Sequence, residues 1–466
     1  MEVGLAGWNM KVGALFKRKD KAGKTADADG RSSSAVVRPL MRDANRKAAH
    51  ADALPRFHSM ASDQFSGRGG DRFSAIRSKL RLAFTPSQPV NDRRMFAGRD
   101  EVLSTMIRAI EDQRLHAVLY GERGIGKTSI LHMLTQAARE ARYIVVYSSC
   151  GANSTFDETF RAAAVDIPLL FHSGFAPTTS EAEKGLTLAD LAPEGPLSPS
   201  KFGDLCSKLT GTRVLIILDE FDRCESGAFR RDVAELIKNL SDRLGRVQLV
   251  LAGVAADLTE LVEHIPSIRR NIFALSVPKM PDTEVLQIVS NGEREAGLTF
   301  DPAASASVVA VSLGSPYIAN LLCHHAGHAA LDEGRSTVLP RDVSGAVDRA
   351  VTEFRARIGK PVQARIRALM EAGNGEALAT AARAALSGEG TFGIGELQAF
   401  GDVDAKRAQQ VLQLLAAEKI LVVDEEEGSG RLMSFAEEGL PTFIWMSWAQ
   451  QSINTDPTAA RVASRS

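Results

Sequence analysis

Two short runs of residues carry the chemistry that can be read directly from this chain. The first, residues 121–129, reads GERGIGKTS and fills the pattern G-x-x-x-x-G-K-[ST] without a gap. Glycines at these positions let backbone N–H groups turn inward around phosphate groups, and a following helix adds free amide donors and a partial positive charge. The pattern predicts a loop that binds a nucleoside triphosphate. Its residues are Gly121, Glu122, Arg123, Gly124, Ile125, Gly126, Lys127, Thr128 and Ser129.

Two side chains of this loop have separate expected roles. Lys127 is expected to reach the β- and γ-phosphates, and the Thr128 hydroxyl is expected to ligate Mg²⁺. The apolar run His116–Tyr120 before the loop is typical of a strand, and the run Ser129–Leu134 after it has helical periodicity. This strand–loop–helix context favours the phosphate loop over a glycine-rich turn without a ligand.

The second run, residues 214–220, reads VLIILDE. It predicts a buried strand with two carboxylates at its carboxyl end, where ligands bind in open α/β sheets. We expect Asp219 to hold Mg²⁺, directly or through water, and Glu220 to orient and polarise an attacking water. Alone, the run is equally compatible with a strand that enters an acidic turn. The phosphate loop upstream favours the metal and water site.

The elements that would position these residues form an alternating series. Five apolar runs recur between helical stretches, and their continuous Val, Ile and Leu content indicates strands buried on both faces. This alternation predicts a parallel, doubly wound α/β sheet. Residues 166–200, with five prolines, predict an irregular excursion. The expected strands are His116–Tyr120, Tyr143–Tyr147, Val214–Leu218, Gln248–Ala252 and Ile272–Val277.

Composition limits the class of protein. A chain of 466 residues is long enough for two or three domains. No apolar stretch is long enough to span a bilayer, which argues against a membrane protein. The four cysteines have unrelated spacings, which suits a reducing compartment, so we expect a cytoplasmic location.

Charge is unevenly distributed along the chain. Residues 1–94 hold 19 basic and 9 acidic residues, a net charge of +10, whereas the remainder holds 37 basic and 48 acidic residues, a net charge of −11. Residues 1–75 lack a sustained hydrophobic period, so we expect a basic disordered tail; residues 455–466 are expected to be disordered as well. Two interpretations of the amino-terminal tail stay open. It is either a basic arm that binds nucleic acid or the acidic surface of a partner, or a solvated segment without a binding role.

These motifs together resemble the AAA+/STAND class of P-loop ATPases, and within it the origin-recognition-like AAA ATPase domain of many bacterial ATP-binding proteins. The resemblance rests on Phe96-Ala97-Gly98-Arg99, on the phosphate loop and on residues 218–223 (LDEFDR), and it covers roughly residues 84–335. It implies ATP and Mg²⁺ as cofactors. In that family the F-x-G-R segment lies along the adenine, so the resemblance makes Phe96 and Gly98 candidate base contacts.

Two further positions follow from the same resemblance. Related ATPases place an arginine between the fourth and fifth strands that completes a neighbouring subunit's site, which makes Arg269 and Arg270 candidates. A surface arginine pair at a helix end is an equally good interpretation. The segment Gly314-Ser315-Pro316 resembles the G-x-P motif of STAND proteins, which makes Pro316 a candidate nucleotide contact, although proline is also ordinary at a first helical turn.

The chain also departs from the family pattern. Many AAA+ enzymes carry a polar sensor residue at the end of the fourth strand, whereas this chain has Leu251-Ala252-Gly253-Val254-Ala255. An arginine expected in the lid helix is missing, since Ile318-Ala319-Asn320-Leu321-Leu322 follows the proline. These departures predict slow hydrolysis, as in a switch that holds ATP, rather than a fast motor.

The carboxy-terminal third predicts three helices followed by a β-hairpin, which is the order of a winged helix. Residues 361–466 hold 9 basic and 14 acidic residues, and the expected hairpin tip, residues 424–430, is acidic. Because DNA affinity depends largely on phosphate neutralisation, a protein-contact or regulatory role is favoured over DNA reading. We therefore expect self-association or a protein partner through this domain.

The expected organisation has five parts. A basic tail (1–75) precedes a P-loop ATPase core (76–280), a helical lid (281–340), a winged-helix-like α+β domain (341–454) and a second tail (455–466). The leading hypothesis is an ATP-hydrolysing switch of the AAA+/STAND type. Two alternatives stay open: a DNA-associated ATPase adaptor of the transposition or replication-initiation type, with the tail as its DNA arm, and a nucleotide-gated interaction module with negligible turnover.

Overall fold

The computed structural model describes residues 72–175, 185–243, 245–254, 270–388, 390–400, 405–426, 430–437 and 439–455. The two expected tails therefore lie almost wholly outside the described residues. The exceptions are Arg72 to Ala75, which belong to the first helix, α1 (Arg72–Ala83), and Thr455, which ends the last helix. Among the described helices, none combines the length and the apolar character needed to cross a membrane.

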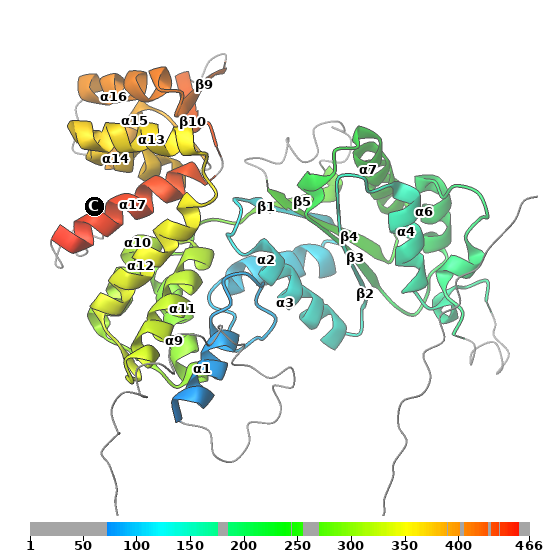
Figure 1. Ribbon diagram of the computed structural model, residues 1–466. Helices are drawn as coiled ribbons and strands as arrows, with labels where there is room; N and C mark the ends of the chain where they lie inside the picture. The colour runs from blue at the N-terminus through cyan, green and yellow to red at the C-terminus, as the bar shows by residue number, and fades with distance from the viewer. Residues whose placement is uncertain are drawn as a thin grey trace, which may run out of the picture. The chain divides into compact units, whose positions relative to one another are not determined.

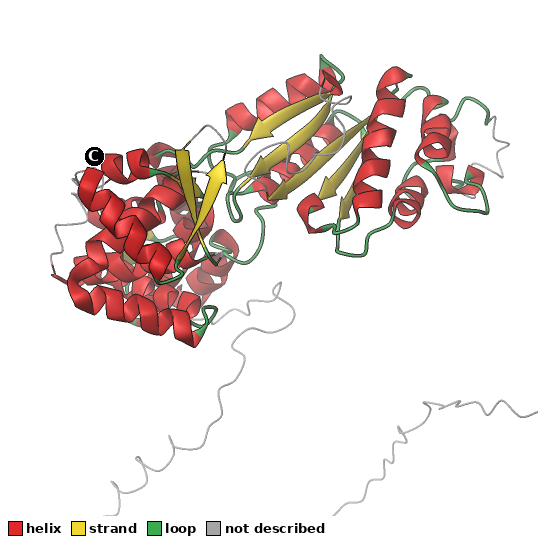
Figure 2. Ribbon diagram, turned by 90° about the horizontal axis from the view of Figure 1, so that it is seen from above, coloured by secondary structure: helices red, strands yellow, loops and turns green. Residues whose placement is uncertain are grey.

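A five-stranded parallel sheet carries the two sequence motifs (Figures 1 and 2). Its strand order is β2-β3-β4-β1-β5, so the strand before the phosphate loop lies two places from the strand that ends in Asp219. The parallel sheet confirms the expected doubly wound α/β class. The strands are β1 (His116–Gly121), β2 (Ile144–Ser149), β3 (Val214–Asp219), β4 (Val247–Val254) and β5 (Ile272–Ser276).

Helices cover both faces of this sheet (Figure 2), which explains why its strands are apolar on both sides. In β3, Leu215 and Ile217 face one helical layer, whereas Ile216 and Leu218 face the other. The first layer is α2 (Asp100–Glu111) and α3 (Lys127–Glu140). The second is α4 (Phe156–Val165), α6 (Pro199–Ser207) and α7 (Gly227–Asp242).

The described residues of the proline-rich excursion after α4 are mostly irregular, as expected, but they include short ordered pieces. Two 3-10 turns lie in its described part, η1 (Leu169–Phe171) and η2 (Leu188–Leu191), and single β-bridges join Pro168 to Thr187 and His172 to Leu209. A third 3-10 turn, η3 (Phe221–Arg223), directly follows the acidic pair on β3.

A helical segment follows the sheet. Its helices and α1 share a hydrophobic core that is separate from the two cores on the faces of the sheet. Two of its helices begin with an N-cap residue followed by proline at the first helical position, namely Asp301-Pro302 and Ser315-Pro316. The segment contains α9 (Asp282–Ala296), α10 (Pro302–Ser312), α11 (Pro316–Asp332) and α12 (Pro340–Arg355), with the short strands β6 (Thr299–Phe300) and β7 (Thr337–Val338).

The carboxy-terminal segment has the expected helices and hairpin, together with two further elements that the sequence interpretation missed. The expected elements are α13 (Lys360–Leu369), α14 (Gly375–Ser387), α15 (Ile394–Phe400), α16 (Ala405–Ala417), β9 (Leu421–Glu426) and β10 (Gly430–Phe435). A π-turn (Met370–Asn374), which the sequence did not predict, joins α13 to α14. The missed elements are β8 (Thr391–Phe392), which adds a third strand in the order β8-β10-β9, and α17 (Leu440–Thr455).

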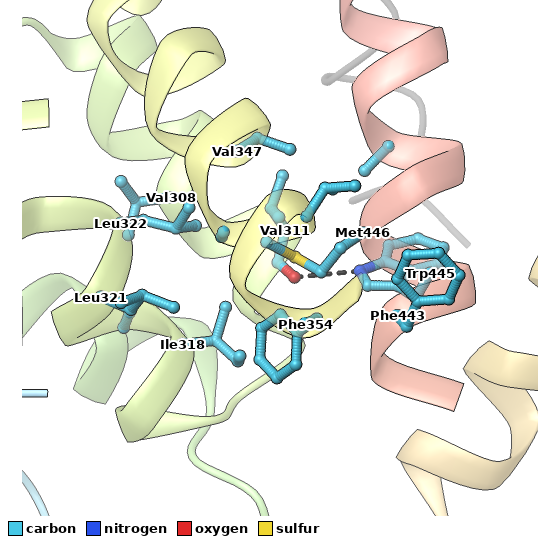
Figure 3. Packing of buried hydrophobic residues seen from close by; sticks show 14 of the residues in the cluster. Val308, Val311, Ile318, Leu321, Leu322, Val347, Phe354, Phe443, Trp445 and Met446 are labelled. Carbon is cyan, nitrogen blue, oxygen red and sulfur yellow. Dashed lines mark hydrogen bonds between the residues drawn. The ribbon is translucent and has the colours of Figure 1, made fainter. Parts of the chain in front are cut away.

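Helix α17 connects the carboxy-terminal segment with the helices before it. It packs against both α14 and α12, and Phe443, Trp445 and Met446 share one buried core with residues of α10–α12 (Figure 3). The indole Nε1 of Trp445 donates a 2.9 Å hydrogen bond to the backbone oxygen of Val311. Val311 lies in the last turn of α10, where carbonyl groups lack intrahelical partners, so Trp445 satisfies one of them.

Candidate functional site

The phosphate loop connects β1 to α3 and needs its glycines for conformation. Gly121, Gly124 and Gly126 have φ angles of 145°, 77° and 101°, which L-residues with a side chain rarely adopt. A Cβ atom on Gly121 would also lie 3.0 Å from the backbone oxygen of Val277. Helix α3 begins at Lys127, immediately after Gly126, so its free N–H groups face the loop. The loop therefore has the backbone of an anion-binding turn at a helix N-terminus.

Lys127 lies folded over this loop. Its side chain is buried, and its Nζ donates hydrogen bonds of 2.8 Å to the backbone oxygens of both Gly121 and Glu122. Burial lowers the pKa of Lys127 to about 8, although the carboxylates of Asp222, Asp219 and Glu122 counteract the shift. A phosphate group in the loop would add negative charge that stabilises the ammonium form.

Asp219 is held from three directions at the carboxyl end of β3. Its Oδ2 atom accepts a 2.9 Å hydrogen bond from the Thr128 hydroxyl and a 2.6 Å hydrogen bond from the Tyr147 hydroxyl. Its Oδ1 atom accepts a 2.8 Å hydrogen bond from the backbone N–H of Glu220. The structure thus brings Thr128 and Asp219, the two expected metal ligands, into direct contact across 91 residues of chain.

Glu220 has an unusual backbone and a fully engaged carboxylate oxygen. Its φ angle of 54° lies in the left-handed region, which is costly for a residue with a side chain. Its Oε2 atom accepts hydrogen bonds of 2.9 Å from the Ser149 hydroxyl and 2.7 Å from Arg223. The side chain is 42% exposed, so solvent reaches the position where we expect it to act.

The F-x-G-R segment packs against α9. The N–H of Gly98 donates a 2.9 Å hydrogen bond to Gln287, and the amide of Asn291 donates one of 3.4 Å to the backbone oxygen of Phe96. Gly98 has a φ of 59°, and a Cβ there would collide with the Glu284 side chain at 2.4 Å. The two residues expected to contact a base therefore lie where the sheet-bearing part meets the helical segment.

Pro316 and Tyr317 place the start of α11 beside the phosphate loop. A Cβ on Gly126 would lie 3.7 Å from the Cγ of Pro316, and one on Gly124 would lie 3.3 Å from the Cβ of Tyr317. The segment between β5 and α9 also contacts the loop, because Lys279 forms an ion pair with Glu122. The structure thus brings the expected proline to the phosphate loop.

Of the two candidate arginines, only Arg270 belongs to the described residues, since Arg269 lies outside them. Arg270 is exposed just before β5. Because β5 runs parallel to β1, with Ile272 opposite His116, Arg270 lies at the end of the sheet away from the phosphate loop. Five residues of strand separate the two ends, about 16 Å. Arg270 therefore lies too far from the phosphate loop of its own chain to contact it.

The described structure also shows partners that the sequence interpretation did not name. Tyr147 and Ser149 contact the acidic pair from β2, Arg223 contacts it from η3, and Lys279 contacts the loop. Tyr147 and Ser149 are two residues apart, so they share one face of β2, and this period-2 spacing was the only available signal. At the end of β4, the N–H of Val254 donates a 2.9 Å hydrogen bond to Asp222.

Comparison with known proteins identifies the part of the chain that contains these residues. Residues 95–252 match the AAA ATPase domain family. This range includes the F-x-G-R segment, the phosphate loop and the acidic pair. No curated protein sequence matches the chain.

Three solved structures are among those similar to this chain. The Orc1 protein of Aeropyrum pernix, solved in complex with DNA, is 17% identical, with 82% of this chain and 98% of that chain covered, at a TM-score of 0.41. Cdc6p of Pyrobaculum aerophilum is 15% identical, with 80% and 98% covered, at 0.40. The RuvB Holliday junction branch migration motor of Thermotoga maritima is 16% identical, with 77% and 96% covered, at 0.41.

Proposed function

We propose that the AAA ATPase domain of this chain, residues 95–252, binds ATP with Mg²⁺ and acts as a slowly hydrolysing molecular switch of the STAND type. The observation that carries the proposal is the contact between the two motifs. The hydroxyl of Thr128, at the start of α3, donates a hydrogen bond to Asp219, at the end of β3. This contact places a hydroxyl and a carboxylate side by side at the mouth of a loop whose backbone suits phosphate.

Each residue then has a defined role. The N–H groups of the loop and of the first turn of α3 bind the phosphates, and Lys127 exchanges its two carbonyl partners for phosphate oxygens. Thr128 and Asp219 fit Mg²⁺ because their donor atoms are hard oxygens and this ion usually takes only one or two protein ligands besides phosphate. The bound ion would neutralise charge on the transferring phosphoryl group. Glu220 would orient the attacking water.

Slow turnover follows from the surroundings of Glu220. Its Oε2 atom already accepts hydrogen bonds from Ser149 and Arg223, so these two donors fix the orientation of the carboxylate that would have to meet the attacking water. The end of β4 offers Gly253 and Val254 in place of a polar sensor side chain. Both features favour a protein that holds ATP for long periods.

The switch itself is supported by the contacts of α11. Pro316 and Tyr317 lie against the phosphate loop, and Tyr317 makes an edge-on ring contact with Phe354 of α12, with ring centroids 6.3 Å apart. Phe354 belongs to the same core as Trp445 of α17 (Figure 3). We infer that α9–α12 form a lid whose position depends on the nucleotide, and that α17 carries its movement to the carboxy-terminal segment.

We further infer that the carboxy-terminal segment is a winged-helix domain used for protein contact. The order α14, β8, α15, α16, β9, β10 supports the assignment. The acidic excess of residues 361–466 supports a protein partner or a second copy rather than DNA. A second copy would also give Arg270 a site to complete, since it cannot reach the loop of its own chain.

ATP turnover measured across a range of protein concentrations tests this proposal. A switch that works alone predicts slow turnover per molecule that does not change with concentration. Completion of the site by Arg270 of a second copy predicts turnover that rises steeply with concentration and falls in Arg270→Ala. Arg231→Ala, which removes an exposed arginine on α7, is the matched control. Fast turnover independent of concentration would contradict both predictions.

A DNA-associated adaptor is the second candidate, and the net charge of +10 in residues 1–94 favours it. Deletion of residues 1–71 removes 13 basic and 8 acidic residues, which is half of this net charge, and leaves α1, whose Leu80 is fully buried, intact. An adaptor predicts DNA binding that weakens strongly with salt and is lost on this deletion, together with DNA-stimulated turnover. Equal DNA affinity of the full and shortened chains would contradict it.

A further inference from the structure

Tyr147 is a polar residue of the site to which no motif assigns a role. It lies on β2, paired in register with Ile217, and its hydroxyl reaches Asp219, two residues further along β3. Two residues of strand span about 6.6 Å, a distance that requires a side chain as long as tyrosine. A shorter hydroxyl at this position could not make the contact.

The contact is directional and well supported. A phenol donates and a carboxylate accepts, and the 2.6 Å separation is in the short range expected for a hydroxyl bonded to a charged acceptor. His132 of α3 packs on the tyrosine ring, with centroids 5.4 Å apart, so the ring is held between α3 and the sheet.

The lone pairs of Asp219 show what this hydrogen bond does. A carboxylate oxygen has two lone pairs, and the Oδ2 atom uses both, one for Thr128 and one for Tyr147. Within the described residues, Oδ1 accepts one hydrogen bond, from the N–H of Glu220. The carboxylate plane is therefore fixed by three donors, and one lone pair of Oδ1 is left for a water or a cation.

We propose that Tyr147 is a positioning residue for Mg²⁺, which fixes the Asp219 carboxylate so that Thr128 and Asp219 present their oxygens to the metal together. This inference rests on the proposed ATP and Mg²⁺ binding. Without the tyrosine hydroxyl, the Asp219 side chain can rotate away from Thr128. Metal binding must then return this side chain to one orientation, and the cost of doing so weakens Mg²⁺ binding. Nucleotide binding that does not involve the metal should be unaffected, because Tyr147 makes no described contact with the phosphate loop backbone.

The test is a Mg²⁺ titration of the binding of a fluorescent ATP analogue, with parallel measurements in excess EDTA. Tyr147→Phe should require about tenfold more Mg²⁺ for half-saturation, the order expected for one hydrogen bond to a charged group, with affinity in EDTA unchanged. Tyr147→Leu, which also lacks the hydroxyl, should give the same shift. The affinity measured in excess EDTA separates the two possible causes of a shift. It stays unchanged if only metal positioning is lost, and it falls if the site is generally damaged.

Tyr143→Phe is the matched control. Tyr143 lies one residue before β2 on the same face, and its hydroxyl accepts a 3.0 Å hydrogen bond from Arg213, away from the site. Its Mg²⁺ dependence should equal that of the wild type. In an Asp219→Asn background, Tyr147→Phe should add no further shift, because the two residues act through one contact.

The outcomes are distinguishable. A wild type that binds the analogue in a Mg²⁺-dependent manner, with Tyr147→Phe unchanged in that dependence, would overturn the role of Tyr147 and leave the proposed function intact. The role of Tyr147 is equally overturned if Tyr147→Phe lowers the urea midpoint alone, which is what a purely structural tyrosine predicts. A wild type that binds no analogue with or without Mg²⁺ would overturn the proposed function and this inference together.

Discussion

The candidate site and the carboxy-terminal segment hold their parts together by opposite means. Around Asp219, hydroxyl and amide donors from three elements fix one carboxylate, and each of the three contacts is polar. Around α17, apolar side chains of α10, α12 and α14 form one core, in which Trp445 supplies a single hydrogen bond. Substitutions should therefore change chemistry with little loss of stability in the first region, and stability with little loss of chemistry in the second.

The largest effect is expected from Glu220→Gln. It removes the group that would accept a proton from water while keeping the size of the side chain, so ATP turnover should fall by about 10²- to 10⁴-fold with ATP affinity retained. Steady-state turnover and equilibrium binding measure the two quantities. Glu225→Gln, in the exposed turn after the site, should change neither. Normal turnover in Glu220→Gln would show that another residue activates the water.

The next largest effect is expected from Trp445→Phe. The change keeps an aromatic ring in the core but leaves the buried Val311 carbonyl without its partner, so the free energy of unfolding should fall by about 1–3 kcal/mol. Trp448→Phe is the control because Trp448 is only partly buried. Urea unfolding measures both variants. Equal stability of Trp445→Phe and the wild type would mean that this hydrogen bond does not tie α17 to α10.

Trp445→Phe also sharpens the comparison between the two regions. If the site and the carboxy-terminal segment depend on different forces, ATP affinity in this variant should match that of the wild type. A nucleotide-induced change in tryptophan fluorescence should become smaller, since Trp445 is the residue at the junction. Loss of ATP binding in a folded Trp445→Phe protein would contradict the separation of the two regions.

The last and smallest effect is expected from the pH dependence of the free energy of unfolding. His116, at the start of β1, is buried, and its Nδ1 accepts a 2.9 Å hydrogen bond from the N–H of Leu249. Burial lowers the pKa of His116 from 6.5 to about 4. Between these values the unfolded chain binds more protons than the folded one, so the free energy of unfolding should decrease as pH falls from 6.5 towards 4. Between pH 7 and pH 5 this group contributes about 2 kcal/mol.

His116→Asn isolates that contribution because the asparagine oxygen can still accept the hydrogen bond from Leu249. Urea midpoints at pH 7 and pH 5 should differ less in this variant than in the wild type. An equal difference in both proteins would show that other groups account for the whole pH dependence.

The sequence was sufficient to predict the sheet, its strands and both motifs, because continuous apolar runs and the G-x-x-x-x-G-K-[ST] pattern are local signals. It could not predict Tyr147, because the contact with Asp219 depends on the register between β2 and β3, which neither strand reveals alone. Helix α17 was missed for a related reason. Its sequence, LPTFIWMSWAQQSINT, has apolar residues on most sides and therefore no clear amphipathic period. The reason for this pattern is that α17 packs against two helices, α12 and α14, at once.

The predictions for the ends of elements were less accurate than those for their centres. Strand β2 begins at Ile144 and ends at Ser149, two residues beyond the expected Tyr147, so the residue that contacts Glu220 lay outside the expected strand. Hydrogen bonds to β3 extend the strand past its apolar part. The candidate arginines show a different limit, since a role for Arg270 depends on a second molecule that one sequence cannot place.

Equilibrium binding of ATP to Lys127→Ala tests the central claim most directly. Lys127 is the one ammonium group that bonds to the loop carbonyls in the described structure, and the proposal requires it to transfer those bonds to phosphate. Titration calorimetry should show ATP binding to the wild type and to Lys238→Ala, an exposed lysine on α7, and no binding to Lys127→Ala at concentrations that saturate the wild type. ATP affinity equal to the wild type in folded Lys127→Ala would contradict the assignment of this loop as the nucleotide site.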